Sequence, residues 1–286
     1  DIFGIVIICI WKYHGKTSKV KNNNMGIQTI QTQNNASFIG DSEAYYLESS
    51  GFDYTTIAAT AKTFVFVVQN TSALPTNMTL ASVWKVQNGE RAFFIRITSA
   101  GILEYWQSST GNAADLRVIS SAALPVTMFM LAIVVDPSLS GGTNVVKFYV
   151  NGSLVTRTAP IDGGTYTMYS GSSQKLRLFA HFDSSGAQAE NFKGALNQFR
   201  IHDVAMNSTQ VSELYSSGMF IDSYSAIPDS CIIAPDFNNP TFSSNYTIPD
   251  LIAANDFTQT SLTSAGDKTS HWNKYLNPYK VSNPMI

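Results

Sequence analysis

The sequence predicts an all-β fold, either a sandwich of two sheets or a barrel, and three observations lead to this class. Short apolar segments recur from residue 43 to residue 202, separated by clusters of turn residues. Helical periodicity is almost absent from these segments. The 286 residues are 44% hydrophobic and 12% aromatic, enough to bury one large β core or two small ones.

The segments that we expect to be strands are short, rich in apolar residues and bounded by turn residues. In chain order they are 43–48, 63–69, 79–86, 92–98, 101–107, 128–135, 145–150, 153–158, 175–182 and 195–202. Residues 64–68 and 128–135 are nearly all apolar, so we expect them in the middle of a sheet with both faces covered. Residues 92–98 and 195–201 alternate more clearly between apolar and polar.

The clearest single element is a hairpin over residues 145–155. Alternating apolar side chains run into Asn151-Gly152 and continue beyond it. Asn-Gly suits a two-residue turn in which both central residues need a positive φ. The sequence therefore predicts the register of this hairpin as well as its existence.

One short helix is expected after the last strand. Asn207 can cap its start, Gln210 stands at the capping-box position, and Gly218 can end it. Val211, Leu214 and Tyr215 then share one face of the helix.

The residues carried by these elements resemble a known family. Residues 149–152 read Tyr-Val-Asn-Gly, a strand follows, and residues 192–201 read Phe-Lys-Gly-Ala-Leu-Asn-Gln-Phe-Arg-Ile before a helix that contains Leu-Tyr. This order is similar to that of laminin G-like domains of the concanavalin A-like lectin/glucanase superfamily. The resemblance covers residues 36–218 and implies a jelly-roll sandwich of two antiparallel sheets, although a fold alone does not supply a function.

Residues 1–35 form an apolar segment followed by a polar linker. Residues 2–11 are apolar and lysines follow them at 12, 16, 19 and 21. The run is too short to span a bilayer, which needs about 20 residues, and its charges lie on the wrong side for a secretory signal. Two interpretations fit: the end of a membrane anchor with a lysine flank, or a strand docked on this domain or a neighbour.

Residues 219–286 are predicted to be an extended C-terminal arm. Six prolines interrupt every potential regular element, yet nine aromatic residues distinguish the segment from a solvated linker. Such a chain is ordered when its rings lie in grooves, either on its own domain or on neighbouring subunits. The aromatic residues are Phe220, Tyr224, Phe237, Phe242, Tyr246, Phe257, Trp272, Tyr275 and Tyr279.

Composition excludes some partners. Only 13% of the residues are charged and the net charge is −2, which argues against nucleic acid because binding it requires many phosphate contacts. Cys9 and Cys231 are expected to be buried thiols of low reactivity, since two isolated cysteines form no disulfide framework.

No catalytic, cofactor-binding or metal-binding residue is predicted. Glycoside hydrolysis needs two facing carboxyl groups, which related glucanases place on one strand, and no such strand exists here. The single acids Glu90, Glu104, Asp115 and Asp136 are expected to be solvated charges at turns or strand ends. Asp183 is the best candidate for a calcium ligand at a loop, but one acid is too few for the ion. The four histidines, which have no ligand spacing and are expected to be structural, are His14, His181, His202 and His271.

Two functional hypotheses follow. The first is a non-enzymatic structural component of a large assembly, best fitted by a virion, in which the protein is a minor capsid or capsid-associated component. Its arms would tie neighbouring subunits together or reach an internal membrane. The alternative is a lectin-like glycan-binding or adhesion module at a cell or particle surface, with loops 108–114, 138–144 and 183–191 as the binding rim.

Overall fold

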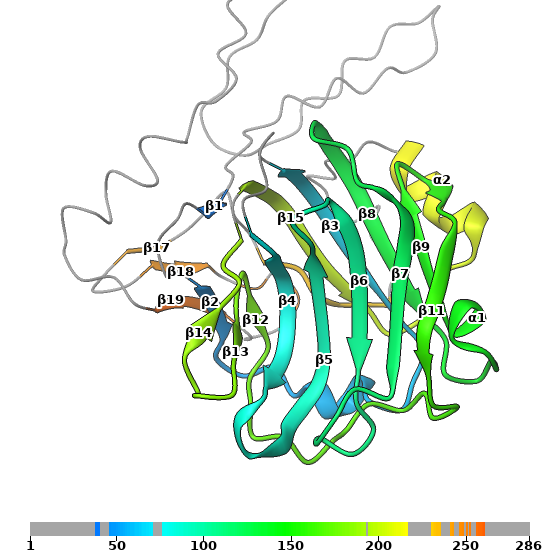
Figure 1. The fold of residues 1–286 in the computed structure, drawn as a ribbon. Helices are drawn as coiled ribbons and strands as arrows, with labels where there is room; N and C mark the ends of the chain where they lie inside the picture. Colours follow the sequence, from blue (N-terminus) through cyan, green and yellow to red (C-terminus); the bar gives the residue numbers. More distant parts are fainter. Residues whose placement is uncertain are drawn as a thin grey trace, which may run out of the picture.

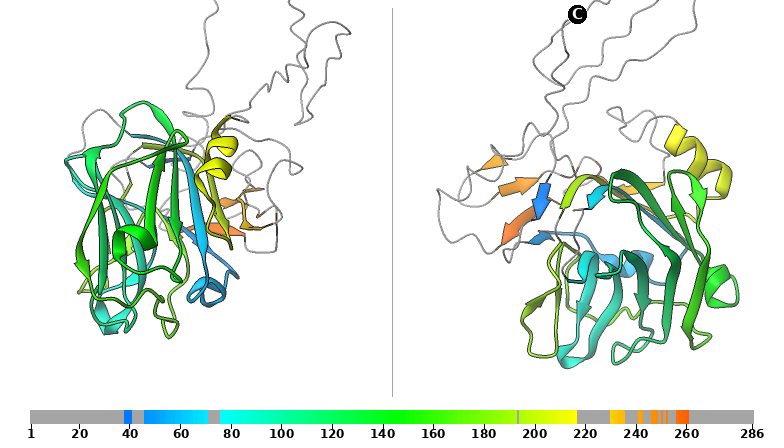
Figure 2. Two further views of the ribbon diagram at one scale, coloured as in Figure 1. Left: turned by 90° about the vertical axis from the view of Figure 1, so that its right-hand side faces the viewer. Right: turned by 45° about the horizontal axis from the view of Figure 1, so that its top comes forward.

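The protein is a sandwich of two β-sheets, as predicted (Figure 1). The computed structural model describes residues 38–40, 46–70, 76–192, 194–216, 230–235, 241–242, 246–248, 250, 252 and 256–260. All strand pairs are antiparallel except for one contact between β13 and β4. Figure 2 shows the two layers, with helix α2 (Ser208–Ser216) beside them.

The smaller sheet has seven strands in the order β1-β15-β3-β8-β9-β10, and β16 also pairs with β15. Its strands are β1 (Phe38–Gly40), β3 (Lys62–Asn70), β8 (Met128–Val135), β9 (Val146–Val150), β10 (Ser153–Leu154), β15 (Gly194–His202) and β16 (Cys231–Ile233). The two segments predicted to be central, in β3 and β8, lie next to each other inside this sheet.

The larger sheet has twelve strands, with a main path β11-β7-β6-β5-β4-β12-β2-β19-β18-β17 and the hairpin β13–β14 beside β4. Its strands are β2 (Tyr46–Ser49), β4 (Met78–Lys85), β5 (Glu90–Ile97), β6 (Ile102–Gln107), β7 (Leu116–Ala123), β11 (Arg157–Asp162), β12 (Arg177–Leu178), β13 (His181–Phe182), β14 (Gln188–Ala189), β17 (Thr241–Phe242), β18 (Tyr246–Ile248) and β19 (Phe257–Thr260). Three short helices lie in connections: η1 (Tyr54–Ile57), η2 (Gln87–Gly89) and α1 (Gly142–Val145).

Apolar side chains from both sheets fill the space between them. The rings of Phe64 in β3 and Phe93 in β5 lie 5.0 Å apart across this space, and both side chains are fully buried. Burying a phenylalanine side chain stabilises the fold by about 1.5–3 kcal/mol, so this core holds the two sheets together.

Helix α2 covers the other face of the smaller sheet. Its capping box forms as predicted, because Asn207 Oδ1 accepts from Gln210 N and Gln210 Oε1 accepts from Asn207 N, both at 2.9 Å. Val211 and Leu214 pack against Val65, Val67, Met130, Ala132 and Val134. Segments 64–68 and 128–135 are therefore covered on both faces, as predicted; Gly218 lies outside the described residues.

The Asn151-Gly152 hairpin is confirmed. Asn151 has φ 50° and Gly152 has φ 77°, and the flanking residues pair as Ser153 with Val150. Asn151 Oδ1 also accepts a hydrogen bond from Met130 N at 2.9 Å, which ties the turn to β8. The asparagine thus serves the turn and the neighbouring strand.

Two predicted strands are in fact each divided in two. Segment 153–158 pairs with β9 only over β10, and from Arg157 onward it pairs with β7 in the other sheet. Segment 175–182 is broken at Phe179, whose φ of 77° cannot belong to a strand, so β12 and β13 are separate. The change of sheet in segment 153–158 leaves no mark in the alternation of apolar residues, which explains the first error. In segment 175–182 both strands belong to the larger sheet, and the break comes from the positive φ of a phenylalanine, a residue that gives no turn signal.

The sequence analysis missed strand β7. Its buried residues alternate at Leu116 and Val118, but the strand ends in Ser120, Ser121, Ala122 and Ala123, small residues of low strand propensity. Its pairing with β6 and β11 fixes it in the larger sheet.

Part of the segment 219–286 forms regular structure, contrary to the expectation that prolines would break every element. Strand β16 adds to β15 and strand β19 pairs with β2, so these pieces extend both sheets. Phe257 is fully buried, with its ring 6.4 Å from that of Phe199. This ring lies on its own domain rather than on a neighbour, whereas most of the other aromatic residues of the segment lie outside the described side chains.

Residues 1–37, including the apolar run and Cys9, lie outside the described residues. In the part of the chain that the structure describes, no helix has the length and apolarity of a membrane span. Cys231 is buried in β16, and burial raises the pKa of its thiol to about 11, as expected for a thiol of low reactivity.

Candidate functional site

The outer face of the larger sheet carries a cluster of charged and aromatic side chains. Because side chains alternate along a strand, Phe93 and Ile95 of β5 enter the core while Phe94 and Arg96 point outward. On β6, Leu103 and Tyr105 enter the core while Glu104 and Trp106 point outward. We call the outward set formed by Trp84, Arg91, Phe94, Arg96, Glu104, Trp106 and Arg117 the arginine–aromatic face.

Glu104 is the centre of this face. Its carboxylate accepts from Arg96 Nε at 2.6 Å, from Arg117 Nη2 at 2.5 Å and from Trp106 Nε1 at 2.8 Å. Only 3% of its side chain is exposed. These three donors come from strands β5, β6 and β7, so one carboxylate joins three neighbouring strands.

The protonation state of Glu104 follows from these contacts. Burial would raise the pKa of its carboxyl group, but the hydrogen bonds from Arg117, Trp106 and Arg96 outweigh burial and hold the pKa below its usual value. Glu104 is therefore a carboxylate at neutral pH.

The arginines lie against the aromatic rings. Arg117 and Arg96 are 4.6 and 5.3 Å from the ring centroid of Trp106, and Arg96 is also 5.5 Å from that of Phe94. Arg91 lies 5.8 Å from the ring of Trp84, which contacts Phe94 at 5.9 Å. Trp84 and Phe94 are almost fully buried, whereas Trp106 is partly exposed.

A second carboxylate reaches the same face from the loop after β14. Glu190 Oε1 accepts from Arg96 Nη1 at 2.8 Å, so Arg96 lies between Glu104 and Glu190. The ring of His181 packs against that of Phe94 at a tilt of 50°, with centroids 4.5 Å apart, and its Nδ1 lies 4.0 Å from Glu190 Oε2. Burial lowers the pKa of His181 more than Glu190 raises it, so the ring is neutral at neutral pH.

The prediction for Glu104 was wrong, because this residue is a buried centre of hydrogen bonds and not a solvated charge. The other three acids do not bind to Glu104 or its partners. Asp115 and Asp136 accept from the nearby residues Ser109 and Ser138, whereas Glu90 accepts from Gln174 in the connection between β11 and β12. The hairpin turn at residues 99–101 could have revealed the site, since it pairs Glu104 with Arg96 across β5 and β6.

The predicted rim loops are linked to the sandwich in two groups. Loops 108–114 and 138–144 both contact the connection between β11 and β12, whereas loop 183–191 contacts η2 and supplies Glu190. The linking hydrogen bonds are Tyr169 N to Ser108 O (2.7 Å), Gly141 N to Tyr166 Oη (2.9 Å) and Gln87 N to Asp183 O (3.3 Å). Loop 183–191 is thus the rim loop that contributes to the arginine–aromatic face.

Asp183 stabilises its own turn. Its Oδ1 accepts from Ser185 Oγ at 2.6 Å and from Ser185 N at 2.8 Å, and these bonds lower the pKa of its carboxyl group. Among the described residues, no three His, Cys, Asp or Glu side chains are close enough to hold a metal ion together.

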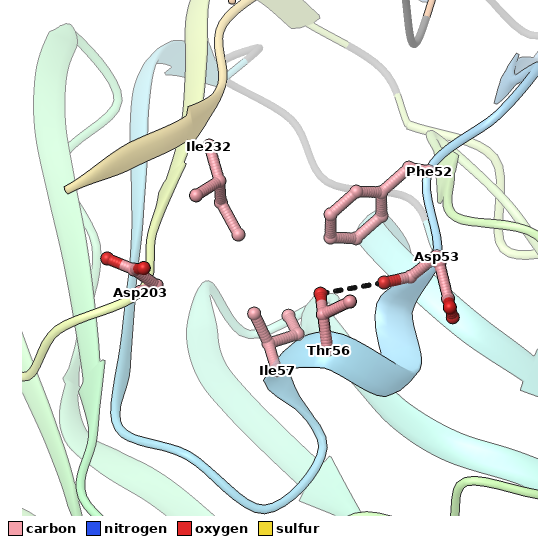
Figure 3. Close-up of a pocket in the computed structure, with 6 residues that line it drawn as sticks. All are labelled: Phe52, Asp53, Thr56, Ile57, Asp203 and Ile232. Carbon is pink, nitrogen blue, oxygen red and sulfur yellow. Dashed lines mark hydrogen bonds between the residues drawn. The ribbon is translucent and has the colours of Figure 1, made fainter. Parts of the chain in front are cut away.

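A pocket of about 350 Å³ lies away from this face, between η1 and β16 (Figure 3). Phe52, Ile57 and Ile232 face one another across it, while the carboxylates of Asp53 and Asp203 point away. Asp53 Oδ1 is used to cap η1 by accepting from Thr55 N at 3.0 Å. The pocket therefore offers an apolar space without converging polar groups.

Comparisons with known proteins agree with the fold. The family described as the concanavalin A-like lectin/glucanases superfamily matches residues 42–212. No curated protein shows significant sequence similarity to the chain.

Among solved structures, a Bacteroides ovatus protein named as a "putative carbohydrate binding protein" is 16% identical, with a TM-score of 0.55 over 80% of this chain. The chain spans 58% of the length of that protein. A carbohydrate-binding module of a Ruminococcus gnavus sialidase, bound to sialyllactose, is 18% identical over 59% of this chain and 93% of its own, with a TM-score of 0.45. A Limulus polyphemus pentraxin is 14% identical over 64% of this chain and 81% of its own, with a TM-score of 0.43.

Proposed function

The chain belongs to the concanavalin A-like lectin/glucanase superfamily, and we propose that it is a non-catalytic glycan-binding module. We place the binding site on the arginine–aromatic face. The observation that carries the proposal is Trp106, a partly exposed indole fixed between Arg96 and Arg117 by a hydrogen bond to Glu104.

Trp106 has the properties of a platform for a sugar ring. The flat indole can contact the apolar C–H face of a sugar, and the two neighbouring guanidinium groups can donate to its oxygen atoms. Because Glu104 fixes the ring, little side-chain entropy is lost when a ligand binds. The indole is thus held in place while part of its surface stays open to a ligand.

Glycoside hydrolysis is a poor alternative for this face. Arg96 brings Glu104 and Glu190 close together, but a glycosidase needs one carboxyl group whose pKa is raised so that it can act as the acid. The pKa of Glu104 is lowered, and both carboxylates are occupied by Arg96. We therefore assign binding and not catalysis.

The comparisons support this proposal at the level of the family. The superfamily is named for its lectins as well as its glucanases, and the Bacteroides ovatus protein named for carbohydrate binding shares the fold. The assembly hypothesis depended on residues 1–35 and 219–286, most of which lie outside the described residues. It stays a prediction, and the described sandwich gives no observation in its favour.

Replacing Trp106 with alanine is expected to weaken glycan binding at least tenfold, because the variant loses the platform of the site. A glycan array followed by calorimetry with the best ligand measures the change. Leu154→Ala is the control, since Leu154 is 56% exposed and lies on the edge strand β10 of the other sheet. Equal affinity of the Trp106→Ala variant and the wild type would refute this location of the site.

A further inference from the structure

The arginine–aromatic face presents guanidinium groups more than aromatic rings. Arg91 lies over Trp84, Arg96 over Phe94 and Trp106, and Arg117 over Trp106. Since Trp84 and Phe94 are almost fully buried, a ligand reaches them less readily than the arginines that lie against them. The chemistry that a ligand meets here is largely that of arginine.

These arginines have fewer carboxylate partners than they could bind. Arg96 and Arg117 share Glu104, and Arg96 also takes Glu190. Among the described residues, Arg91 forms no ion pair, and its one hydrogen bond is from Nη2 to the carbonyl oxygen of Val86 at 3.3 Å. Glu90, the acid next to Arg91 in sequence, forms an ion pair with Lys85 and not with Arg91.

The face also has unused donors. A guanidinium group offers five N–H donors in a planar arrangement. Arg117 uses Nη2 for Glu104 and Arg91 uses Nη2 for Val86 O, whereas Nη1 of each arginine makes no hydrogen bond among the described residues and is not buried. A carboxylate or sulfate group on a ligand can therefore accept hydrogen bonds from Nη1 of Arg91 and Arg117 without displacing Glu104.

From these observations we propose that the ligand is an acidic glycan, whose carboxylate or sulfate groups bind to Arg117 and Arg91. This proposal rests on the proposed glycan-binding function and specifies its ligand class. Arginine binds such groups through two parallel hydrogen bonds, and the partly exposed side chain of Arg117, 28% accessible, can supply them.

The spacing of the two arginines favours an oligosaccharide over a single sugar. Arg91 is on β5 and Arg117 on β7, with β6 between them. Neighbouring strands are about 4.8 Å apart, so the two backbones are separated by about 10 Å across the sheet. Trp106 lies on β6 directly opposite both Arg117 and Phe94, and Arg91 is a further three residues, about 10 Å, along β5. A ligand that reaches both arginines therefore passes over Trp106, where a sugar ring can contact the indole.

The test uses the full-length protein and matched pairs of oligosaccharides. One pair compares a uronic acid oligosaccharide with its carboxyl-reduced form, and a second compares a sulfated oligosaccharide with its desulfated form. We expect at least one acidic member to bind ten times or more tightly than its neutral counterpart, with affinity falling as salt is added. The pair that shows this preference identifies the anionic group.

The variants Arg117→Gln and Arg91→Gln are expected to weaken binding of the acidic member about tenfold or more, and binding of the neutral member by a clearly smaller factor. Arg117→Lys keeps the charge but loses the paired donors, so we expect intermediate binding. Lys147→Gln is the control, because it removes one positive charge from β9 in the opposite sheet. Thermal unfolding of each variant, compared with that of the wild type, tests whether the fold is kept.

The outcomes separate the two proposals. Equal binding of acidic and neutral members overturns the acidic ligand class and leaves glycan binding intact. Absence of binding to any glycan overturns the proposed function itself. Tighter binding of a single-stranded oligonucleotide than of any acidic glycan also overturns the ligand class, because the face would then recognise another polyanion.

Discussion

The Glu104→Ala variant is expected to lose about 2–3 kcal/mol of unfolding free energy, one of the two largest effects that we predict. Removing one partner of a buried ion pair leaves the other charges uncompensated, and Glu104 has three partners. The estimate is below that for a fully buried pair because 18% of the Arg96 side chain and 28% of that of Arg117 stay in contact with water. Urea unfolding at pH 7 measures the loss.

The control for this variant is Glu213→Ala. Glu213 is exposed on α2, so its removal is expected to change stability by less than about 0.5 kcal/mol. Equal losses in the two variants would show that Glu104 does not join β5, β6 and β7.

The loss of unfolding free energy at acidic pH is also expected to depend on Glu104. The pKa of Glu104 is lowered on folding, so its contribution to stability is complete above the unfolded value of 4.5 and is lost as the pH falls through the lower folded value. The Glu104→Gln variant should therefore lose less stability than the wild type between about pH 5 and pH 3.

The Lys62→Met variant is expected to be more stable than the wild type by several kcal/mol below pH 7. Lys62 is fully buried at the start of β3, and its Nζ has no hydrogen-bond partner in the described structure. Burial lowers the pKa of this lysine from 10.5 to about 7. Methionine has a similar volume and removes the cost of burying a charge.

The gain in stability from Lys62→Met is expected to decrease as the pH rises above about 7. Below about pH 7 the lysine is charged in both states, and the wild type bears the full cost of burial. Between about 7 and 10.5 only the unfolded state keeps the proton, so wild-type stability rises with pH by up to about 1.4 kcal/mol per pH unit. The difference between wild type and variant should shrink over this window. If the difference in unfolding free energy between wild type and variant stayed constant from pH 6 to pH 10, Lys62 would not be a buried, unpaired amine. Lys147→Met is the control, because Lys147 is partly exposed.

Much of the fold could be predicted because it depends on local signals. The Asn151-Gly152 turn, the capping box of Asn207 and the apolar run 128–135 each fix an element through neighbouring residues, and β8 has the predicted bounds. The change of sheet near residue 155 could not be predicted, because it is set by pairing between Arg157 and Ser120, which are far apart in sequence.

The candidate site was missed for a related reason. The hairpin turn at residues 99–101 could have paired Glu104 with Arg96, but Arg117 looks like an isolated charge in the sequence and joins them only through the register of β6 and β7. Since β7 was not recognised as a strand, Arg117 could not be placed beside Trp106. Glu190 reaches the face from a loop, where sequence alternation gives no guide to direction.

The location of the ligand is tested most directly by nuclear magnetic resonance of the full-length protein, through the indole N–H signal of Trp106 during glycan titration. This N–H donates to Glu104 at the centre of the proposed site, so its chemical shift is expected to change as glycan is added. The shift should reach its plateau at the same glycan concentration as the shifts of the backbone amides of β5, β6 and β7. A bound glycan that leaves the Trp106 signal unchanged, and shifts only the amides of loops 108–114 and 138–144, would contradict the account.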